Sequence, residues 1–549
     1  MAAFVASSFL ALVAGHAASF GSTNFQTGPI SAVRMDAMDR EISSDAFQGR
    51  APGTAGEKKT ISWLIAHLKG LGLEPAGPNG KWTQNVPLVR TKLGVGRFSA
   101  AVNGHAIPLV FGRDIYLSTV RPLDNITVND APMVFVGYGV NAPEQGWDDF
   151  KGVDLQGKIA VMLVNDPDFQ AGPGDDSTGK FGGRRMTYYG RWTYKYEEAA
   201  RRGAIGALIV HDTQGAGYGW ETVTAPQGEN YDVADATGRL SLQGWLEGAA
   251  AANVFRSAGL NLDELRAAAR RSDFKPIQLN AHFSADVPVV HERLMSHNVL
   301  AKISGAGRPG ETVMYGAHWD AYGVGAPDVH GNRIRPGAND DALGVVGLLE
   351  IARAFKAGPR PKRSVLFGFW SAEERGLLGS ETYALRPVVP ASNIVANITL
   401  DILQTGGPAR DVMLVGQGQN SLERDLARAA KVQGRTVTPE ALPERGLFYR
   451  ADHFSLAKRG VPTLLFMAIS GAPDLVHGGR QAGATWLADY MKCYHQTCDS
   501  WRSDWNLQGA AQDVALAYSV GRKLSMTADK PTWNAASEFR SIRQGGGSR

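Results

Sequence analysis

The chain has 549 residues, which is too long for one ordinary hydrophobic core and predicts two or three domains. Its hydrophobic content of 44% and charged content of 20% are typical of a globular protein in water. Lys and Arg number 57 against 53 Asp and Glu, and the net charge of +4 is spread along the chain without basic blocks. This distribution argues against nucleic acid or an anionic membrane as the main partner.

The first residues predict a signal peptide over positions 1–18. An apolar run at 1–14 is followed by the small residues around Ala17 and Ala18, as expected before a cleavage site. No Lys or Arg precedes the run, so a buried N-terminal helix is the alternative. No later stretch approaches the roughly 18 apolar residues that a membrane span needs. We therefore expect an exported protein, periplasmic or secreted, without a stable membrane span.

Residues 19–130 are predicted to begin the main domain, and residues 131–288 to form an inserted one. The first part shows helical spacing within 32–75, interrupted by Gly and Pro at 49–54, and then short strands. The second part combines buried strands with a helix that ends at Gly203. Its acids and histidines do not cluster with metal-ligand spacing, so we interpret it as an accessory α/β domain. The alternative is a plain α/β segment of the main fold.

Residues 289–530 alternate strands and helices, which predicts an α/β fold with a mostly parallel sheet flanked by helices. Strands are expected at 299–303, 312–316, 364–370, 394–403, 411–415 and 463–467. Helices are expected at 341–356, 376–384, 421–432, 452–459 and 510–526. The polar residues 531–549 are predicted to form a flexible tail.

Acids and histidines gather where several of these predicted strands end. They are His318, Asp320, Asp340, Glu373, Glu374, Asp401 and His495. Ligands of a parallel α/β sheet bind at the carboxyl ends of its strands. Two histidines and several carboxylates fit a pair of zinc ions about 3.5–4 Å apart, bridged by one carboxylate. A further carboxylate is then needed as general base, and the adjacent Glu373 and Glu374 offer one ligand and one base.

These motifs resemble the zinc exopeptidases of the aminopeptidase Y and bacterial leucyl aminopeptidase type, in the form that carries an inserted protease-associated domain. The matching segments lie at 316–320, 337–342, 371–380, 401, 450–455, 460–462 and 494–499. The inserted unit resembles the protease-associated domain at 137–139, 157–159 and 199–204. The likeness covers nearly all of residues 30–530 and implies the fold shared by zinc exopeptidases and phosphorylase/hydrolase-like proteins.

The resemblance also implies residue roles. His318 and Asp401 would hold one zinc ion, Glu374 and His495 the other, and Asp340 would bridge both. Glu373 would be the general base. Asp320 would orient the His318 ring, and Asp499 would do the same for His495. The implied activity is removal of N-terminal residues from peptides by a metal-bridging hydroxide, with two Zn2+ ions per chain.

Several rival assignments accompany these roles. Asp341 is an alternative bridge, although we expect it to cap the helix that follows. His453 and His477 compete with His495, and His330 is interpreted as a loop residue. Tyr449 is either a hydrogen-bond donor to the oxyanion of the tetrahedral intermediate or a packed loop tyrosine.

Cys493 and Cys498, the only cysteines, are expected to form one local disulfide in an oxidising compartment. The rival functions are a carboxypeptidase or dipeptidase on the same scaffold, a glutaminyl cyclase, or a binding protein without catalysis. The partners expected are peptide substrates, and the sequence leaves the oligomeric state open.

Overall fold

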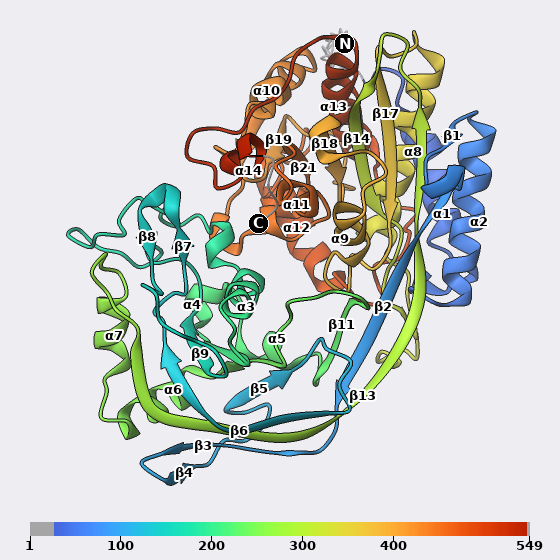
Figure 1. Cartoon of the computed structure of the whole chain (residues 1–549). Helices are drawn as coiled ribbons and strands as arrows, with labels where there is room; N and C mark the ends of the chain where they lie inside the picture. Colours follow the sequence, from blue (N-terminus) through green and yellow to red (C-terminus); the bar gives the residue numbers. More distant parts are fainter. Residues whose placement is uncertain (1–26, 546–549) are drawn as a thin grey trace, which may run out of the picture.

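The computed structural model describes residues 27–545, so the predicted signal peptide lies outside the described residues. Two halves lie side by side, and one long strand, β13, passes through both (Figure 1). The first half holds the predicted metal-site residues and is called the peptidase half, from the resemblance above. The second half is called the insert. None of the helices within residues 27–545 combines the length and hydropathy needed to cross a membrane.

The peptidase half is an α/β layer structure built on one sheet, which confirms the predicted fold class. Its strands run in the order β21-β18-β14-β17-β13, and the first four are mutually parallel. Their bounds are β14 (Arg308–His318), β17 (Arg363–Trp370), β18 (Ile394–Leu400) and β21 (Thr463–Phe466). β13 (Ile277–Ile303) runs antiparallel to β17, and β2 (Thr83–Leu93) continues the sheet beyond it. A small parallel pair, β19 (Asp411–Leu414) and β20 (Thr436–Pro439), stands apart.

Helices cover both faces of this sheet because its strands are apolar on both faces. Alternate residues of β14 show the division, since Val313, Tyr315 and Ala317 face one core and Met314 faces the other. The first face carries α1 (Ala32–Ile42), α2 (Ala55–Gly70), α8 (Leu343–Ala357), α10 (Leu422–Val432) and α13 (Gln508–Met526). The second face carries α9 (Leu378–Leu385) and α11 (His453–Ala457). The strands and helices expected in this half are present, and α12 (Gly479–Cys493) is an additional helix.

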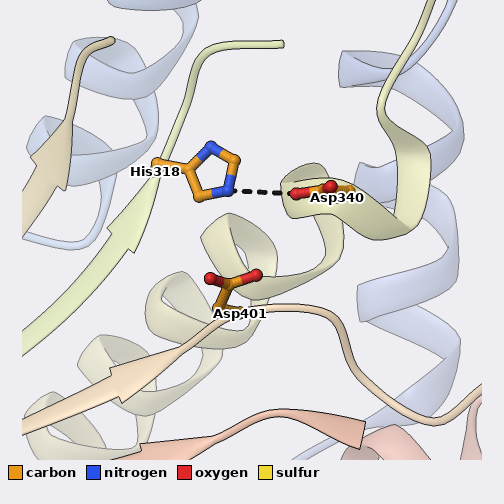
Figure 2. A group of neighbouring side chains, drawn as sticks. All are labelled: His318, Asp340 and Asp401. Atoms are coloured by element: carbon orange, nitrogen blue, oxygen red, sulfur yellow. Dashed lines mark hydrogen bonds and ion pairs between the residues drawn. The ribbon is translucent and has the colours of Figure 1, made fainter. Parts of the chain in front are cut away.

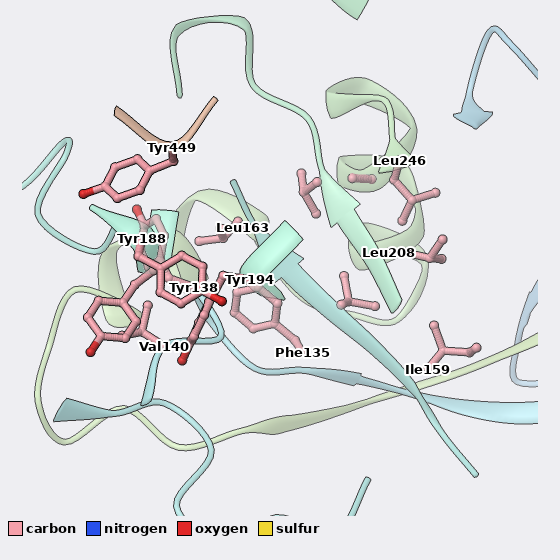
Figure 3. Packing of buried hydrophobic residues seen from close by; sticks show 14 of the residues in the cluster. Phe135, Tyr138, Val140, Ile159, Leu163, Tyr188, Tyr194, Leu208, Leu246 and Tyr449 are labelled. Atoms are coloured by element: carbon pink, nitrogen blue, oxygen red, sulfur yellow. The ribbon is translucent and has the colours of Figure 1, made fainter. Parts of the chain in front are cut away.

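The strands of the insert follow in the order β6-β9-β10-β12-β5 and are joined to those of the peptidase half through β13. The strands are β5 (Ile115–Ser118), β6 (Asn125–Phe135), β9 (Ile159–Leu163), β10 (Gly206–Val210) and β12 (Leu242–Leu246). Around them lie β3 (Arg97–Val102), β4 (His105–Ile107), α3 (Trp192–Arg201), α4 (Thr213–Ala216), α5 (Trp220–Thr224), α6 (Gly248–Ser257) and α7 (Leu262–Ala268). β11 (Glu229–Val233) does not pair with these strands and instead pairs with β2. Figure 3 shows how the buried side chains of the insert continue to Tyr449 of the peptidase half.

The boundary of the insert lies earlier than the predicted residue 131. β3 pairs with β13 beside β6, and β5 closes the far edge of the insert's sheet, so the unit begins after β2 ends at Leu93. The sequence of the short strands before residue 125 does not show which strands they pair with. The sharing of β13 explains the difficulty, because residues 277–288 pair within the insert and residues 289–303 within the peptidase half.

Residues 531–545, the part of the predicted flexible tail that the structure describes, pack against the rest of the chain. Trp533 and Phe539 are buried, and the Trp533 indole donates a hydrogen bond to the Gly460 carbonyl oxygen over 2.9 Å. The chain then forms α14 (Arg540–Gly545). The prediction considered the polar composition of this segment and not its few aromatic residues, whose burial stabilises the packed conformation of residues 531–545.

Candidate metal centre

The predicted metal-site residues lie together at the carboxyl edge of the parallel sheet. His318 is the last residue of β14, and Asp401 directly follows β18. Glu373 and Glu374 follow β17 after a short turn. Because neighbouring parallel strands end at the same edge, residues far apart in sequence meet there.

Two groups of side chains could each hold a metal ion, and they share Asp340. One group is His318, Asp340 and Asp401, and the other is Asp340, Glu374 and His495. In each, one ligand atom per residue lies within 4.8 Å of the others. Figure 2 shows the three side chains of the first group pointing toward one another from two strand ends and a turn. The five residues predicted as ligands are therefore brought together.

Asp340 occupies the shared position because its two oxygens face different histidines. Oδ1 lies 3.1 Å from His318 Nε2, and Oδ2 lies 3.2 Å from His495 Nε2. His495 Nε2 is also 3.2 Å from Glu374 Oε2. A carboxylate with one oxygen directed to each group is the geometry expected of a bridging ligand.

The turn that carries Asp340 is fixed by its main chain. Gly337 has φ +55°, and a Cβ there would lie 2.2 Å from the Asp340 carbonyl oxygen, so no larger residue fits without movement. The Asp499 carboxylate accepts the N–H groups of Asn339 and Asp340, each over 3.1 Å. Asp499 therefore positions the turn of Asp340. The sequence analysis expected Asp499 to orient the His495 ring, but the structure shows no hydrogen bond between these two residues.

The partner of His495 is Tyr322, which the sequence analysis missed. The Tyr322 hydroxyl lies 3.0 Å from His495 Nδ1, and the two ring centroids are 4.6 Å apart. Cys493 and Cys498 form a disulfide, which closes the short loop that carries His495. The only available signal was the position of Tyr322 two residues after Asp320, and a tyrosine there is equally consistent with packing.

Asp320 lies beside His318, as expected, but its main chain makes the closer contact. His318 Nδ1 is 3.1 Å from the Asp320 carbonyl oxygen and 3.7 Å from its carboxylate. The carboxylate accepts the N–H of Glu373 over 3.0 Å, so Asp320 links the ends of β14 and β17. Asp341 accepts the N–H of Gly344 at the start of α8 over 3.1 Å, which agrees with the expected capping role.

Arg50 is a second residue of the site that the sequence analysis did not identify. Its side chain is completely buried behind the site. Its guanidinium donates hydrogen bonds to the carbonyl oxygens of Trp319, Pro336 and Gly337, over 2.8, 2.6 and 2.7 Å. These carbonyls flank His318 on one side and the turn of Asp340 on the other. Arg50 thus joins the N-terminal segment to two parts of the metal centre.

The site contains several buried carboxyl groups whose negative charges are not balanced by neighbouring positive charges. Burial raises the pKa of Asp401 to about 8. Burial also raises the pKa values of Glu373 and Glu374 well above the ordinary range. Burial favours a higher pKa for Asp340 too, but hydrogen bonds from His318 and His495 lower it overall. A divalent cation would relieve this repulsion, and imidazole nitrogens with carboxylate oxygens are donors that zinc accepts. The residues present therefore fit zinc.

Glu373 lies beside His318 of the first group and belongs to neither group. Its Oε2 is 3.9 Å from His318 Nε2, and its side chain is 10% exposed. Glu374, in contrast, faces His495, with its Oε2 3.2 Å from His495 Nε2.

The remaining predicted residues lie outside the two groups. Tyr449 is buried, and its hydroxyl donates a hydrogen bond to Glu538 over 2.6 Å, so the structure favours the packed tyrosine over an oxyanion donor. His453 is buried against Phe448, with ring centroids 4.8 Å apart, and burial lowers its pKa to about 3. His330 and His477 are exposed.

Comparison with known proteins shows which family this part of the chain resembles. Residues 298–519, which contain both groups, match the sequence model of peptidase family M28. This segment is similar in sequence to peptidase family M28. The resemblance to zinc exopeptidases that the motifs indicated is confirmed for this part of the chain.

Two curated relatives are the probable lipoprotein aminopeptidase LpqL of Mycobacterium tuberculosis and leupeptin-inactivating enzyme 1 of Streptomyces exfoliatus. They are 30% and 29% identical over 249 and 232 residues, each covering 41% of this chain. The alignments cover 45% and 48% of those proteins, so the chain spans about half the length of the curated relatives it matches. A solved aminopeptidase from Aneurinibacillus sp. strain AM-1 is 19% identical, with a TM-score of 0.48, covering 93% of this chain and 97% of that one.

Proposed function

We propose that this chain is a zinc-dependent exopeptidase with two zinc ions, which removes N-terminal residues from peptides. The observation that carries the proposal is the pair of ligand groups that share Asp340, with Glu373 beside them. In this proposal His318 and Asp401 hold one ion, and Glu374 and His495 hold the other. The names of the relatives, which include several aminopeptidases, support the choice of peptide substrates with a free amino end.

When bound, the two ions would polarise the scissile carbonyl and lower the pKa of a water molecule between them. Glu373 is proposed as the general base that takes the proton from this water. The water oxygen bonds to the carbonyl carbon, and Glu373 then delivers the proton to the amine nitrogen as the C–N bond breaks. Burial raises the pKa of the Glu373 carboxyl, which makes its carboxylate a stronger proton acceptor.

The insert is proposed to restrict access to the centre, in the manner of the protease-associated domain that it resembles. Arg375, next to Glu374, lies over the ring of Tyr231 in the insert and over the ring of Tyr322, each 5.0 Å from the centroid. The insert therefore reaches the rim of the metal centre. A restricted entrance would favour chain ends over internal loops. The disulfide supports an exported location, periplasmic or secreted, because such bonds persist in oxidising compartments.

The test compares hydrolysis of free-amine peptides and their N-acetylated counterparts, with and without a chelator. We expect cleavage of the free-amine peptide alone, lost on chelation and restored by zinc. Cleavage of the N-acetylated peptide from its carboxyl end would indicate a carboxypeptidase instead. Cyclisation of N-terminal glutamine without hydrolysis would indicate a glutaminyl cyclase, and the absence of any turnover in zinc-loaded protein would indicate a binding protein.

A further inference from the structure

A short N-terminal segment packs behind the metal centre, where it leads from a turn into α2. We call residues 49–57 the N-terminal brace. The brace lies outside residues 298–519, the part of the chain that matches peptidase family M28. Its two charged side chains, Arg50 and Glu57, are buried, with exposed fractions of 0% and 3%. A buried charge is costly unless partners satisfy it, so the partners of these two residues show what the brace holds in place.

Arg50 connects the two main-chain segments that carry His318 and Asp340. Two of its three acceptors near the site are the carbonyl oxygens of Trp319, which directly follows His318, and of Gly337, which begins the turn of Asp340. The guanidinium is planar, so its donors fix the relative position of the acceptors that they share. Arg50 therefore holds these two ligand-bearing segments at a set position relative to each other.

Glu57 reaches the proposed base through a chain of buried hydroxyl groups. One carboxylate oxygen, Oε2, accepts a hydrogen bond from Ser296 Oγ over 3.0 Å, and Ser296 Oγ is hydrogen-bonded to Ser371 Oγ. A hydroxyl has one hydrogen to donate and a carboxylate has none, so Ser296 donates to Glu57 and Ser371 donates to Ser296. The other oxygen of Glu57 lies 2.9 Å from His297 Nδ1, which fixes the carboxylate that ends the chain.

The turn that carries Glu373 needs an anchor of this kind. Ser371 is followed by Ala372, whose φ of +55° is a left-handed conformation that is unfavourable for alanine. The Ser371 N–H donates to Asn298 Oδ1 over 3.1 Å, and the Ala372 carbonyl oxygen accepts the N–H of Leu378 over 3.0 Å. Because the main chain at Ala372 is strained, the direction of the next side chain, Glu373, depends on how firmly the flanking residues are held.

We propose that the N-terminal brace has two separable positioning roles, in which Arg50 places the metal ligands and Glu57 places the base. This inference rests on the proposed exopeptidase function and extends its machinery to a segment outside the family match. Both residues act through others. Arg50 acts through main-chain carbonyl groups, and Glu57 acts through Ser296 and Ser371.

The rival role for Glu57 is to cap α2. Thr54 is the N-cap of this helix, and Glu57 also accepts the N–H of Gly53, which is close to a capping-box arrangement. A cap contributes to stability and has no effect on the direction of Glu373. The two roles can therefore be separated by variants that remove one and keep the other.

Ser296→Ala tests the role of Glu57 with a small change, because it removes the hydroxyl between Glu57 and Ser371 and keeps the cap. We expect kcat to fall roughly 10-fold at unchanged zinc content, since misplacement of a catalytic group by about 1 Å costs up to about 100-fold. Hydrogen exchange of the main-chain amides at 371–374 should also become faster. Thr54→Ala is the matched control: it removes the hydroxyl that accepts the Glu57 N–H over 3.4 Å and should lower Tm without either effect. Wild-type kcat in Ser296→Ala, or the same losses in Thr54→Ala, would overturn this role.

Arg50→Lys tests the other role, because lysine keeps the charge but lacks the planar fork that reaches several carbonyl groups at once. Its zinc affinity should fall by about 10–100-fold in competition with a chelator, the usual effect of losing a residue that orients ligands. Excess zinc should recover turnover. Unchanged zinc affinity would overturn the role of Arg50.

A measurement on the metal-free wild-type protein needs no variant. If the brace holds the ligand segments before zinc binds, the amides at 337–342 should be protected from hydrogen exchange without metal. Rapid exchange there would contradict the role of Arg50 even if Arg50→Lys failed to fold. Zinc affinity and hydrogen exchange do not depend on peptide hydrolysis, so they test the brace even if the exopeptidase proposal fails. If peptides are hydrolysed but the variants lose only Tm, the exopeptidase proposal stands and the brace is merely structural.

Discussion

Replacement of Glu373 by glutamine separates the proposed base from the proposed ligands. Glutamine has the same shape and cannot take up a proton. Glu373 lies outside both ligand groups, and its position is held by a hydrogen bond from its own N–H to Asp320 over 3.0 Å. The substitution should therefore leave zinc binding intact while it removes the proton acceptor. The expected loss in kcat is about 10²–10⁴-fold, the usual contribution of a general base, or about 3–5 kcal/mol in the barrier.

The assay measures zinc content and turnover on the same purified samples. Glu374→Gln serves as the contrasting variant, because Glu374 lies 3.2 Å from His495 within one ligand group. It should lose zinc and activity together, whereas Glu373→Gln should lose activity alone. Near-normal turnover by a zinc-loaded Glu373→Gln enzyme would refute the assignment of the base. Loss of zinc from this variant would show that Glu373 is a ligand instead.

Two further predictions concern the surroundings of the ligands. Tyr322→Phe removes the hydroxyl that lies 3.0 Å from His495 Nδ1 and should weaken zinc binding by about 10–100-fold, measured by competition with a chelator; unchanged affinity would contradict the role of Tyr322. The second concerns the metal-free protein, in which burial raises the pKa of Asp401 to about 8 from an unfolded-state value near 4. Between these pH values the folded state binds more protons than the unfolded state, so the free energy of unfolding should fall as pH rises. Zinc, or Asp401→Asn, should flatten this dependence in thermal melts, and a Tm of the metal-free protein that rises over this range would contradict the reasoning.

The sequence was sufficient to predict the α/β fold of the peptidase half and the residues that meet in it. His318, Asp401 and the Glu373–Glu374 pair each follow a strongly apolar run, and apolar runs of this length form the buried strands β14, β18 and β17. Once the strands are parallel, their ends must meet at one edge. This part of the prediction therefore depended on hydrophobic patterning and not on the details of the loops.

The hydrogen-bond partners of the site could not be predicted, because they depend on loop conformation. Asp499 is close to His495 in sequence, yet its carboxylate turns to the N–H groups of Asn339 and Asp340. Tyr322 is distant from His495 in sequence and lies next to it in space. No local pattern distinguishes these arrangements, since short polar loops admit several conformations of similar energy.

The limits of the insert were missed for a different reason. β13 has 27 residues and serves both halves, so no linker or change of composition marks the point where one unit ends. The burial of Arg191, the residue before α3, also could not be predicted from the sequence, because an arginine at the start of a helix is ordinarily exposed. Only the packing of α3 against the peptidase half reveals it.

The zinc content of Asp340→Asn measures the central claim, that two metal ions share one carboxylate. Metal analysis of the wild-type protein should give two zinc ions per chain. The variant should bind fewer, and more weakly, because each oxygen of Asp340 faces a different group, at 3.1 Å from His318 and 3.2 Å from His495. Turnover should fall with the zinc content. Two tightly held zinc ions in Asp340→Asn, or a wild-type protein that binds a single ion at full activity, would contradict the shared centre.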